Sequence, residues 1–77
     1  MIVKPSETVD LRGLKCPLPA LFAKRALERL PQGNIIEVLC DDPLAAVDVP
    51  FMCSTENFEV VSLAREADLV RLVLRRP

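Results

Sequence analysis

Apolar and polar residues alternate along four stretches of the chain, and this alternation predicts four β-strands. The first strand covers residues 8–12 and ends at Gly13, which opens a turn. The second covers residues 35–40. The last two, residues 58–65 and 69–75, lie about three residues apart, which is a spacing typical of an antiparallel hairpin.

The stretch from residue 17 to residue 30 changes to the spacing of a helix. Pro17 is favoured at the first position of a helix, where the missing N–H costs nothing. A proline and a glycine within residues 31–33 then end the helix. The apolar stripe of this helix consists of Ala20, Ala23, Ala26, Leu27 and Leu30.

A second helix is expected to begin after Asp41-Asp42-Pro43, where an N-cap aspartate is followed by a proline. It should end near residues 56–57. Pro50 interrupts this segment, because a proline inside a helix removes one hydrogen bond. We therefore expect either a kink at Pro50 or a short turn that Asp48 caps again.

These elements follow one another in the order β-α-β-α-β-β. Parallel strands connected through helices cross over in the right-handed sense, which places both helices on one face of the sheet. The predicted fold is therefore an α/β (α+β) two-layer sandwich. The uncovered face would be apolar, which indicates either a partner or dimer contact or the ordinary exposed surface of a small protein. Its aliphatic residues would be Ile35, Leu39, Val61, Leu63 and Val73.

The 77 residues make one small domain, with an expected ordered core over about residues 7–75 and a frayed lead at residues 1–6. A formal net charge of −1 argues against nonspecific binding to nucleic acid. No apolar run approaches the length of a membrane span, and the N-terminus has no signal-peptide core. Three cysteines without a disulfide spacing indicate reduced thiols and residence in the cytoplasm.

Cys16 is the strongest candidate for chemistry because it immediately precedes the first predicted helix. At the N-cap, its sulfur would face the positive end of the helix dipole and the free amides of the first turn. Helix N-termini lower thiol pKa values and so favour the reactive thiolate. Arg12 and Lys15 would add positive charge, and Pro19 would stiffen the turn. The alternative is an inert packing cysteine at an ordinary strand-to-helix turn.

Other kinds of site are excluded by residues that the chain lacks. It has no histidine, so neither Cys-His nor Ser-His-Asp catalysis is available. Pro19 stands where the resolving cysteine of a thioredoxin-type motif would be. The cysteines have no zinc-ligand spacing and two glycines make no phosphate-binding loop, so we expect neither a metal nor a bound cofactor. Cys40 and Cys53 are expected to pack in the core.

Two groups of charged residues are candidates for docking a protein partner. The basic group on the first helix consists of Lys24, Arg25 and Arg29, for which the alternative is a solvated helix face. The acidic group consists of Asp41 and Asp42, for which the alternative is capping of the second helix.

The sequence around Cys16 resembles the signature of a known family. The motif is Asp10-Leu11-Arg12-Gly13-Leu14-Lys15-Cys16-Pro17-Leu18-Pro19, followed by Asp41-Asp42-Pro43 and Asp48-Val49-Pro50. It resembles the TusA/SirA family of small sulfur-carrier proteins over about residues 9–75. The resemblance implies a four-stranded mixed sheet of order 1-2-4-3, with strand 4 antiparallel. Leu18 departs from the pattern of the tRNA-thiolation members, which commonly have an acidic residue there, and this bears on the choice of partner.

The resemblance also implies that Cys16 carries a transient persulfide, supported by its motif neighbours, and that no other cofactor is needed. The sulfur would come from a donor such as a cysteine desulfurase and pass to an acceptor sulfurtransferase or relay protein. Relatives serve tRNA thiolation, sulfur oxidation or molybdenum-cofactor maturation. The competing hypothesis is a non-catalytic regulatory or scaffolding module that binds a protein through the sheet face or the basic helix. A thiol peroxidase is a weaker alternative, because the sequence shows no hydrogen-bonding cluster that would activate a peroxide.

Overall fold

The computed structural model describes residues 5–77 and contains four strands and two helices within them. The sheet has the order β1-β2-β4-β3, in which β1 and β2 are parallel and β4 is antiparallel to both of its neighbours. This confirms the predicted topology. The elements are β1 (Glu7–Asp10), α1 (Leu18–Glu28), β2 (Ile35–Cys40), α2 (Ala45–Glu56), β3 (Glu59–Glu66) and β4 (Leu69–Arg75).

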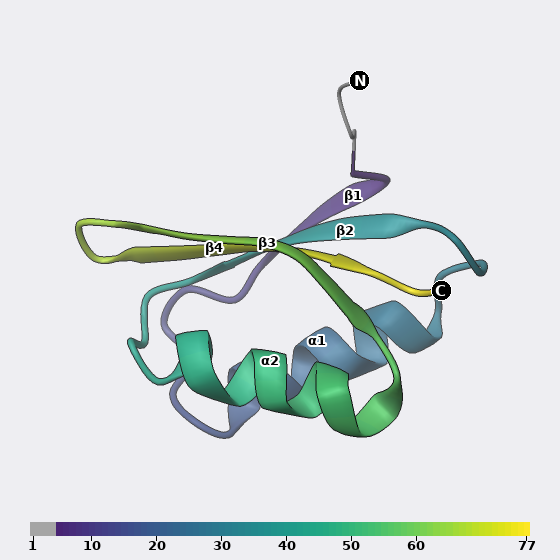
Figure 1. Cartoon of the computed structure of the whole chain (residues 1–77). Coiled ribbons are helices and arrows are strands. Elements are labelled where there is room, and N and C mark those ends of the chain that lie inside the picture. Colours follow the sequence, from purple (N-terminus) through teal and green to yellow (C-terminus); the bar gives the residue numbers. More distant parts are fainter. Residues whose placement is uncertain (1–4) are drawn as a thin grey trace.

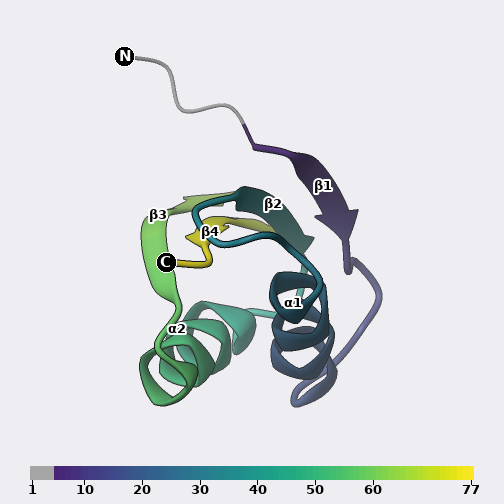
Figure 2. The ribbon, with the colours of Figure 1, turned by 90° about the vertical axis from the view of Figure 1, so that its right-hand side faces the viewer.

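Both helices lie on the same side of the sheet, as the right-handed crossovers require (Figure 1). Viewed from the side, α1 and α2 lie next to each other beneath the strands (Figure 2). The hydrophobic core fills the space between these two layers. Cys40 and Cys53 are free thiols buried in this core, as predicted. The largest apolar side chains of the core are Leu27, Ile36, Val38, Val49, Leu72 and Leu74.

Of the two alternatives expected for the second helix, the short turn after Pro50 is wrong, because α2 continues through Pro50 as one helix. Asp48 therefore does not cap a new turn. It lies in the first turn of α2, and its side chain is free for another contact. The helix ends where Asn57 takes a left-handed conformation with φ of 63°, a common way to terminate a helix.

The uncovered face of the sheet is more polar than the alternation suggested. A bulge between Val60 and Ser62 adds one residue to β3 and shifts its register against β4. Leu63 is consequently paired with the buried Leu72 and faces the helices, so its placement on the uncovered face is wrong. On that face an ion pair joins Arg71 Nε and Glu37 Oε2 at 3.7 Å, and another joins Arg75 to Glu59.

The N-terminal lead is only partly described, because residues 1–4 lie outside the described part of the chain. Ser6 is not frayed, since its backbone N–H donates to the carbonyl of Ile35 at 2.7 Å and extends the pairing of β1 with β2. Neither α1 nor α2, the two helices within residues 5–77, is long and apolar enough to cross a membrane.

Candidate active site

Cys16 lies on the loop that connects β1 to α1, one residue before the helix cap. The N-cap is Pro17, with Leu18 as the first helical residue, so the predicted capping role of Cys16 is wrong. The N–H of Leu18 donates to the carbonyl of Lys15 at 2.9 Å, which forms a turn immediately ahead of the helix. This amide of the first turn is therefore occupied by a backbone carbonyl. Pro19 is buried at the second helical position and anchors the start of α1 to the core.

Two aspartates at the end of β2 hold this loop in place. The N–H of Gly13 donates to Asp41 Oδ1 at 2.9 Å, and the N–H of Cys16 donates to Asp42 Oδ2 at 2.8 Å. Asp42 Oδ1 also accepts the N–H of Leu44 at 3.1 Å, near the start of α2. The carboxyl ends of the parallel strands meet at one edge of the sheet, which brings these segments together.

The environment of Asp42 shows that its side chain holds the Cys16 loop and is not available for docking a partner. Its side chain is buried, with 6% exposure, beneath the segment that carries Cys16. The backbone N–H groups of Cys16 and Leu44 hold the pKa of Asp42 below its ordinary value, because both hydrogen bonds favour the ionised carboxylate. Asp41 remains exposed, although its carboxylate also accepts a loop hydrogen bond.

Arg12 is bound to Asp10 rather than directed at the thiol. The guanidinium makes two hydrogen bonds to the Asp10 carboxylate, at 2.9 and 2.8 Å, and the Arg12 N–H adds a third at 3.1 Å. These contacts lower the pKa of Asp10 to about 2. The pair connects the last residue of β1 to the second residue of the loop, so Arg12 stabilises the conformation of the loop.

The thiol of Cys16 donates a hydrogen bond to Asp48 Oδ2 on α2. This hydrogen bond raises the pKa of Cys16, with further contributions from desolvation and from the negative charges of Asp48 and Asp42. The predicted lowering of the thiol pKa by the helix dipole is therefore wrong. The charges of these two carboxylates both favour the neutral thiol. Cys16 is nevertheless exposed to solvent.

A groove of about 500 Å³ runs between α1 and α2, with Cys16 at one end. Asp48 lies at the same end, in the first turn of α2. Towards the other end, Lys24 Nζ and Glu56 Oε1 form an ion pair at 3.6 Å. Most of the lining is apolar, and its residues are Cys16, Pro17, Ala20, Leu21, Lys24, Asp48, Phe51, Met52, Thr55 and Glu56.

The outward sides of the two helices carry large apolar side chains that are exposed to solvent. The most exposed of them is Phe51, with an exposed fraction of 72%. Exposed apolar patches on small proteins commonly mark interaction sites. We refer to this set as the apolar rim; its residues are Leu18, Leu21, Phe22, Leu44, Val47 and Phe51.

Asp48 and Phe51 were missed as site residues in the sequence. A signal for the rim was present, because Leu44, Val47 and Phe51 have helical spacing and lie on the side of α2 opposite the buried Ala45, Val49 and Cys53. Among the predicted docking residues, Lys24 lines the groove, whereas Arg25 and Arg29 lie outside its lining. A contact with Cys16 could not be anticipated for Asp48 from local patterns.

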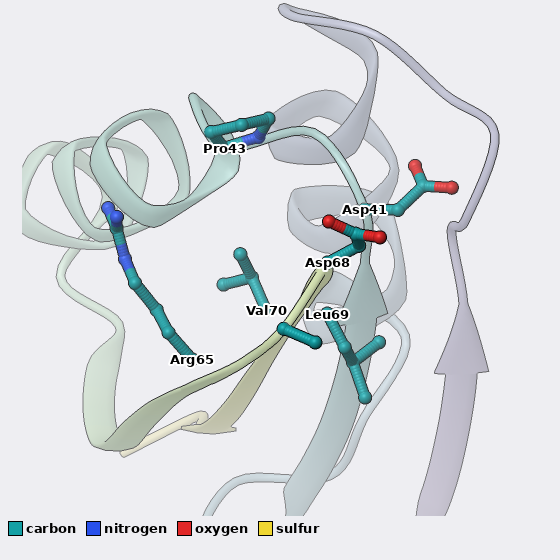
Figure 3. A pocket seen from close by; sticks show the side chains of 7 residues that line it. Asp41, Pro43, Arg65, Asp68, Leu69 and Val70 are labelled. Atoms are coloured by element: carbon teal, nitrogen blue, oxygen red, sulfur yellow. The ribbon is translucent and has the colours of Figure 1, made fainter.

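A second, smaller hollow of about 160 Å³ lies between the tip of the β3–β4 hairpin and the loop after β2. Arg65 and Val70 point to the helix side of the sheet there (Figure 3), and Asp41, Pro43 and Asp68 complete much of its wall. This hollow does not include Cys16, so it is separate from the candidate site.

Replacing Gly13 with alanine should lower the free energy of unfolding by about 1 kcal/mol, because Gly13 has a φ of 90° that L-residues avoid. Beyond the two adjacent residues, no atom lies within 4 Å of the added methyl group, so the cost is backbone strain. Gly33→Ala is the matched control, with a φ of 89° and equally open space. Urea unfolding should show similar losses for both variants. Only Gly13→Ala should change the alkylation rate of Cys16; an equal rate change in both would contradict a role for Gly13 in the loop.

Comparison with known proteins gives one consistent result. The family described as sulfurtransferase TusA matches residues 7–76. Two proteins of Neisseria meningitidis, from serogroups A and B and each named "putative sulfur carrier protein", are 37% identical over 70 residues, covering 91% of this chain and 95% of theirs. A protein of Archaeoglobus fulgidus with the same name is 38% identical over 68 residues, covering 87% and 88%. The crystal structure of a SirA-like protein from Desulfitobacterium hafniense has the same fold, with a TM-score of 0.76, 22% identity, and coverage of 90% of this chain and 95% of that one.

Proposed function

This chain belongs to the TusA sulfurtransferase family, and we propose that it is a sulfur carrier whose Cys16 receives and releases a sulfur atom as a persulfide. The observation that carries this proposal is the position of Cys16. It is the exposed cysteine of the three, held by its backbone at the open end of a groove, while Cys40 and Cys53 are buried.

The proposed reaction is an exchange of one sulfur atom between two thiols. The Cys16 thiolate attacks the terminal sulfur of a donor persulfide, forming a new S–S bond while the S–S bond of the donor breaks. The donor cysteine leaves as a thiolate and takes up a proton, so the proton lost by Cys16 is balanced and there is no net oxidation. An acceptor thiolate then removes the same sulfur in the reverse sense. A carrier needs an accessible cysteine for these steps, but it needs no histidine or metal.

The remaining cysteines support this proposal, because neither can discharge the persulfide within the chain. Burial raises the pKa of Cys40 to about 11 and that of Cys53 also to about 11, so both remain neutral thiols. Pro19 occupies the position where a resolving cysteine would attack. A persulfide on Cys16 would therefore persist until a partner thiol reaches it.

The proposed partners are a donor protein such as a cysteine desulfurase and an acceptor sulfurtransferase or relay protein. The sulfur would serve tRNA thiolation, sulfur oxidation or cofactor sulfuration. The apolar rim and the basic residues Lys24, Arg25 and Arg29 are the proposed docking surface, and Leu18 gives this surface an exposed apolar residue two positions after Cys16.

The test is to incubate the chain with a cysteine desulfurase and cysteine that carries radioactive sulfur. The chain should acquire label that dithiothreitol releases as sulfide, because reduction of a persulfide restores the thiol. The apolar rim would equally suit a scaffold that binds without chemistry. A chain that binds the desulfurase and yet stays unlabelled would contradict the carrier and support that scaffold.

A further inference from the structure

Asp48 is the carboxylate at the groove that lacks a cationic or backbone partner in the described chain. Two other acidic residues near the site have partners within the chain. Asp42 accepts two backbone N–H groups, and Glu56 forms an ion pair with Lys24. Within residues 5–77 no lysine or arginine forms an ion pair with Asp48, whose carboxylate accepts only the Cys16 thiol. A charge in this position is available to a partner.

We propose that a protein partner lays an apolar segment across the groove and places a lysine or arginine of that segment on Asp48, and that this ion pair frees the Cys16 thiol for sulfur exchange. The proposal rests on the proposed carrier function and identifies the chemistry of its partner. The partner segment would carry its own reactive sulfur beside that basic residue.

The apolar character of the segment follows from what surrounds Cys16. Leu21 and Phe51 flank the groove, and the whole apolar rim remains exposed in the free chain. Covering these side chains would remove them from water, which favours association. It would also exclude water from the groove, and an ion pair made there is stronger than one in open solvent.

The basic residue follows from the charges that face the sulfur. Asp48 and Asp42 face Cys16 from the side of α2, and Lys15 precedes it on its own loop. Lys24 lies across the groove but is paired with Glu56. Two carboxylates thus face Cys16 against one loop lysine, so the net charge at this end of the groove is negative, and a cation complements it.

The expected consequence is that docking changes the state of the thiol. In the free chain the hydrogen bond to Asp48 and its charge retain the proton on Cys16, which limits reaction with oxidants and foreign electrophiles. A cation beside Asp48 would offset that charge, so the pKa of Cys16 would fall and its proton would pass to solvent. The carrier would then be reactive mainly where a partner covers it.

The first arm of the test places the cation on the chain itself. Leu44 is one helical turn before Asp48 and is exposed, so Leu44→Lys brings an ammonium group next to the carboxylate. Alkylation of Cys16 by iodoacetamide at pH 7 should become about three- to tenfold faster. Leu44→Gln is the matched control without charge and should leave the rate near that of the parent. An equal rate for the lysine and glutamine variants would overturn the proposal.

The second arm removes the carboxylate and measures both the alkylation rate of Cys16 and the half-saturating concentration for sulfur uptake. Asp48→Asn should speed alkylation, because the charge that retains the proton is gone. It should also raise the half-saturating concentration for sulfur uptake from a cysteine desulfurase by about fivefold, because the docking cation loses its partner. Asp68→Asn removes the same charge from the exposed hairpin tip. It should change neither the alkylation rate nor the half-saturating concentration. Unchanged half-saturation in Asp48→Asn would overturn the docking of a cation.

The two arms also separate this inference from the carrier function. If no variant, including the parent, takes up sulfur on Cys16, the carrier function fails, and the Leu44→Lys result still decides whether a cation at Asp48 frees the thiol. If the parent takes up sulfur and Asp48→Asn behaves like the parent in both assays, the inference alone is wrong.

Discussion

Replacing Cys16 with serine should abolish sulfur loading completely. Intact-mass measurement of the parent after incubation with a cysteine desulfurase and cysteine should show one added sulfur atom, about 32 Da. Cys16→Ser should show no added mass, because a serine hydroxyl cannot form a persulfide. The exposed position of Cys16 means that this substitution should leave the core and the free energy of unfolding nearly unchanged.

The two buried cysteines provide the controls for this experiment. Cys40→Ala and Cys53→Ala should load to the same extent as the parent, since both thiols are covered by the core and have pKa values of about 11. Desulfurases also release sulfide, which can modify any accessible thiol, so the position of the added sulfur must be mapped by peptide mass spectrometry. Loading that persists in Cys16→Ser, or that spreads over all three cysteines, would favour the scaffold over the carrier. A scaffold would also keep its partner in Cys16→Ser.

The elements of the fold could be predicted because each depends on residues that are close in the sequence. The alternation in residues 35–40 gave β2 its bounds, Ile35–Cys40, and the two runs near the C-terminus became the β3–β4 hairpin. The right-handed crossover rule placed both helices on one face (Figure 1). Cys16 could be selected for the same reason, since the turn that presents it is encoded by its immediate neighbours.

The chemistry of Cys16 could not be predicted in this way, because it depends on a residue 32 positions away. The helix-dipole argument considered α1 alone, whereas the packing of α2 against α1 brings the Asp48 carboxylate to the sulfur. The misplacement of Leu63 has a similar origin, since one extra residue at the bulge reverses the direction of every later side chain in β3. Local patterns were therefore enough to select Cys16 as the candidate residue, but not to predict its electrostatic environment.

Asp42→Asn should be the most destabilising of the substitutions considered, with the midpoint of thermal unfolding lowered by about 5 to 10 °C. The two carboxylate oxygens of Asp42 accept different backbone N–H groups, those of Cys16 and Leu44. An asparagine has one acceptor oxygen, so its NH₂ group would face one of these donors in a buried position. Asp41→Asn is the matched control, because Asp41 is exposed and accepts a single loop hydrogen bond. Its effect on the midpoint should be small.

The acid dependence of unfolding tests the same contact through its charge. The pKa of Asp42 in the folded chain is below the ordinary value of 3.8, so its ionisation stabilises the fold at any pH above that value. This contribution is lost as the pH falls through the lower, folded pKa, and the parent should therefore lose stability below about pH 4. Asp42→Asn should lose less over the same range, because it has no carboxylate to protonate. The Asp10 carboxylate, paired with Arg12, titrates in both chains and cancels in the difference. Parallel curves for parent and variant, from urea unfolding between pH 2 and pH 7, would mean that the hydrogen bonds of Asp42 do not depend on its charge.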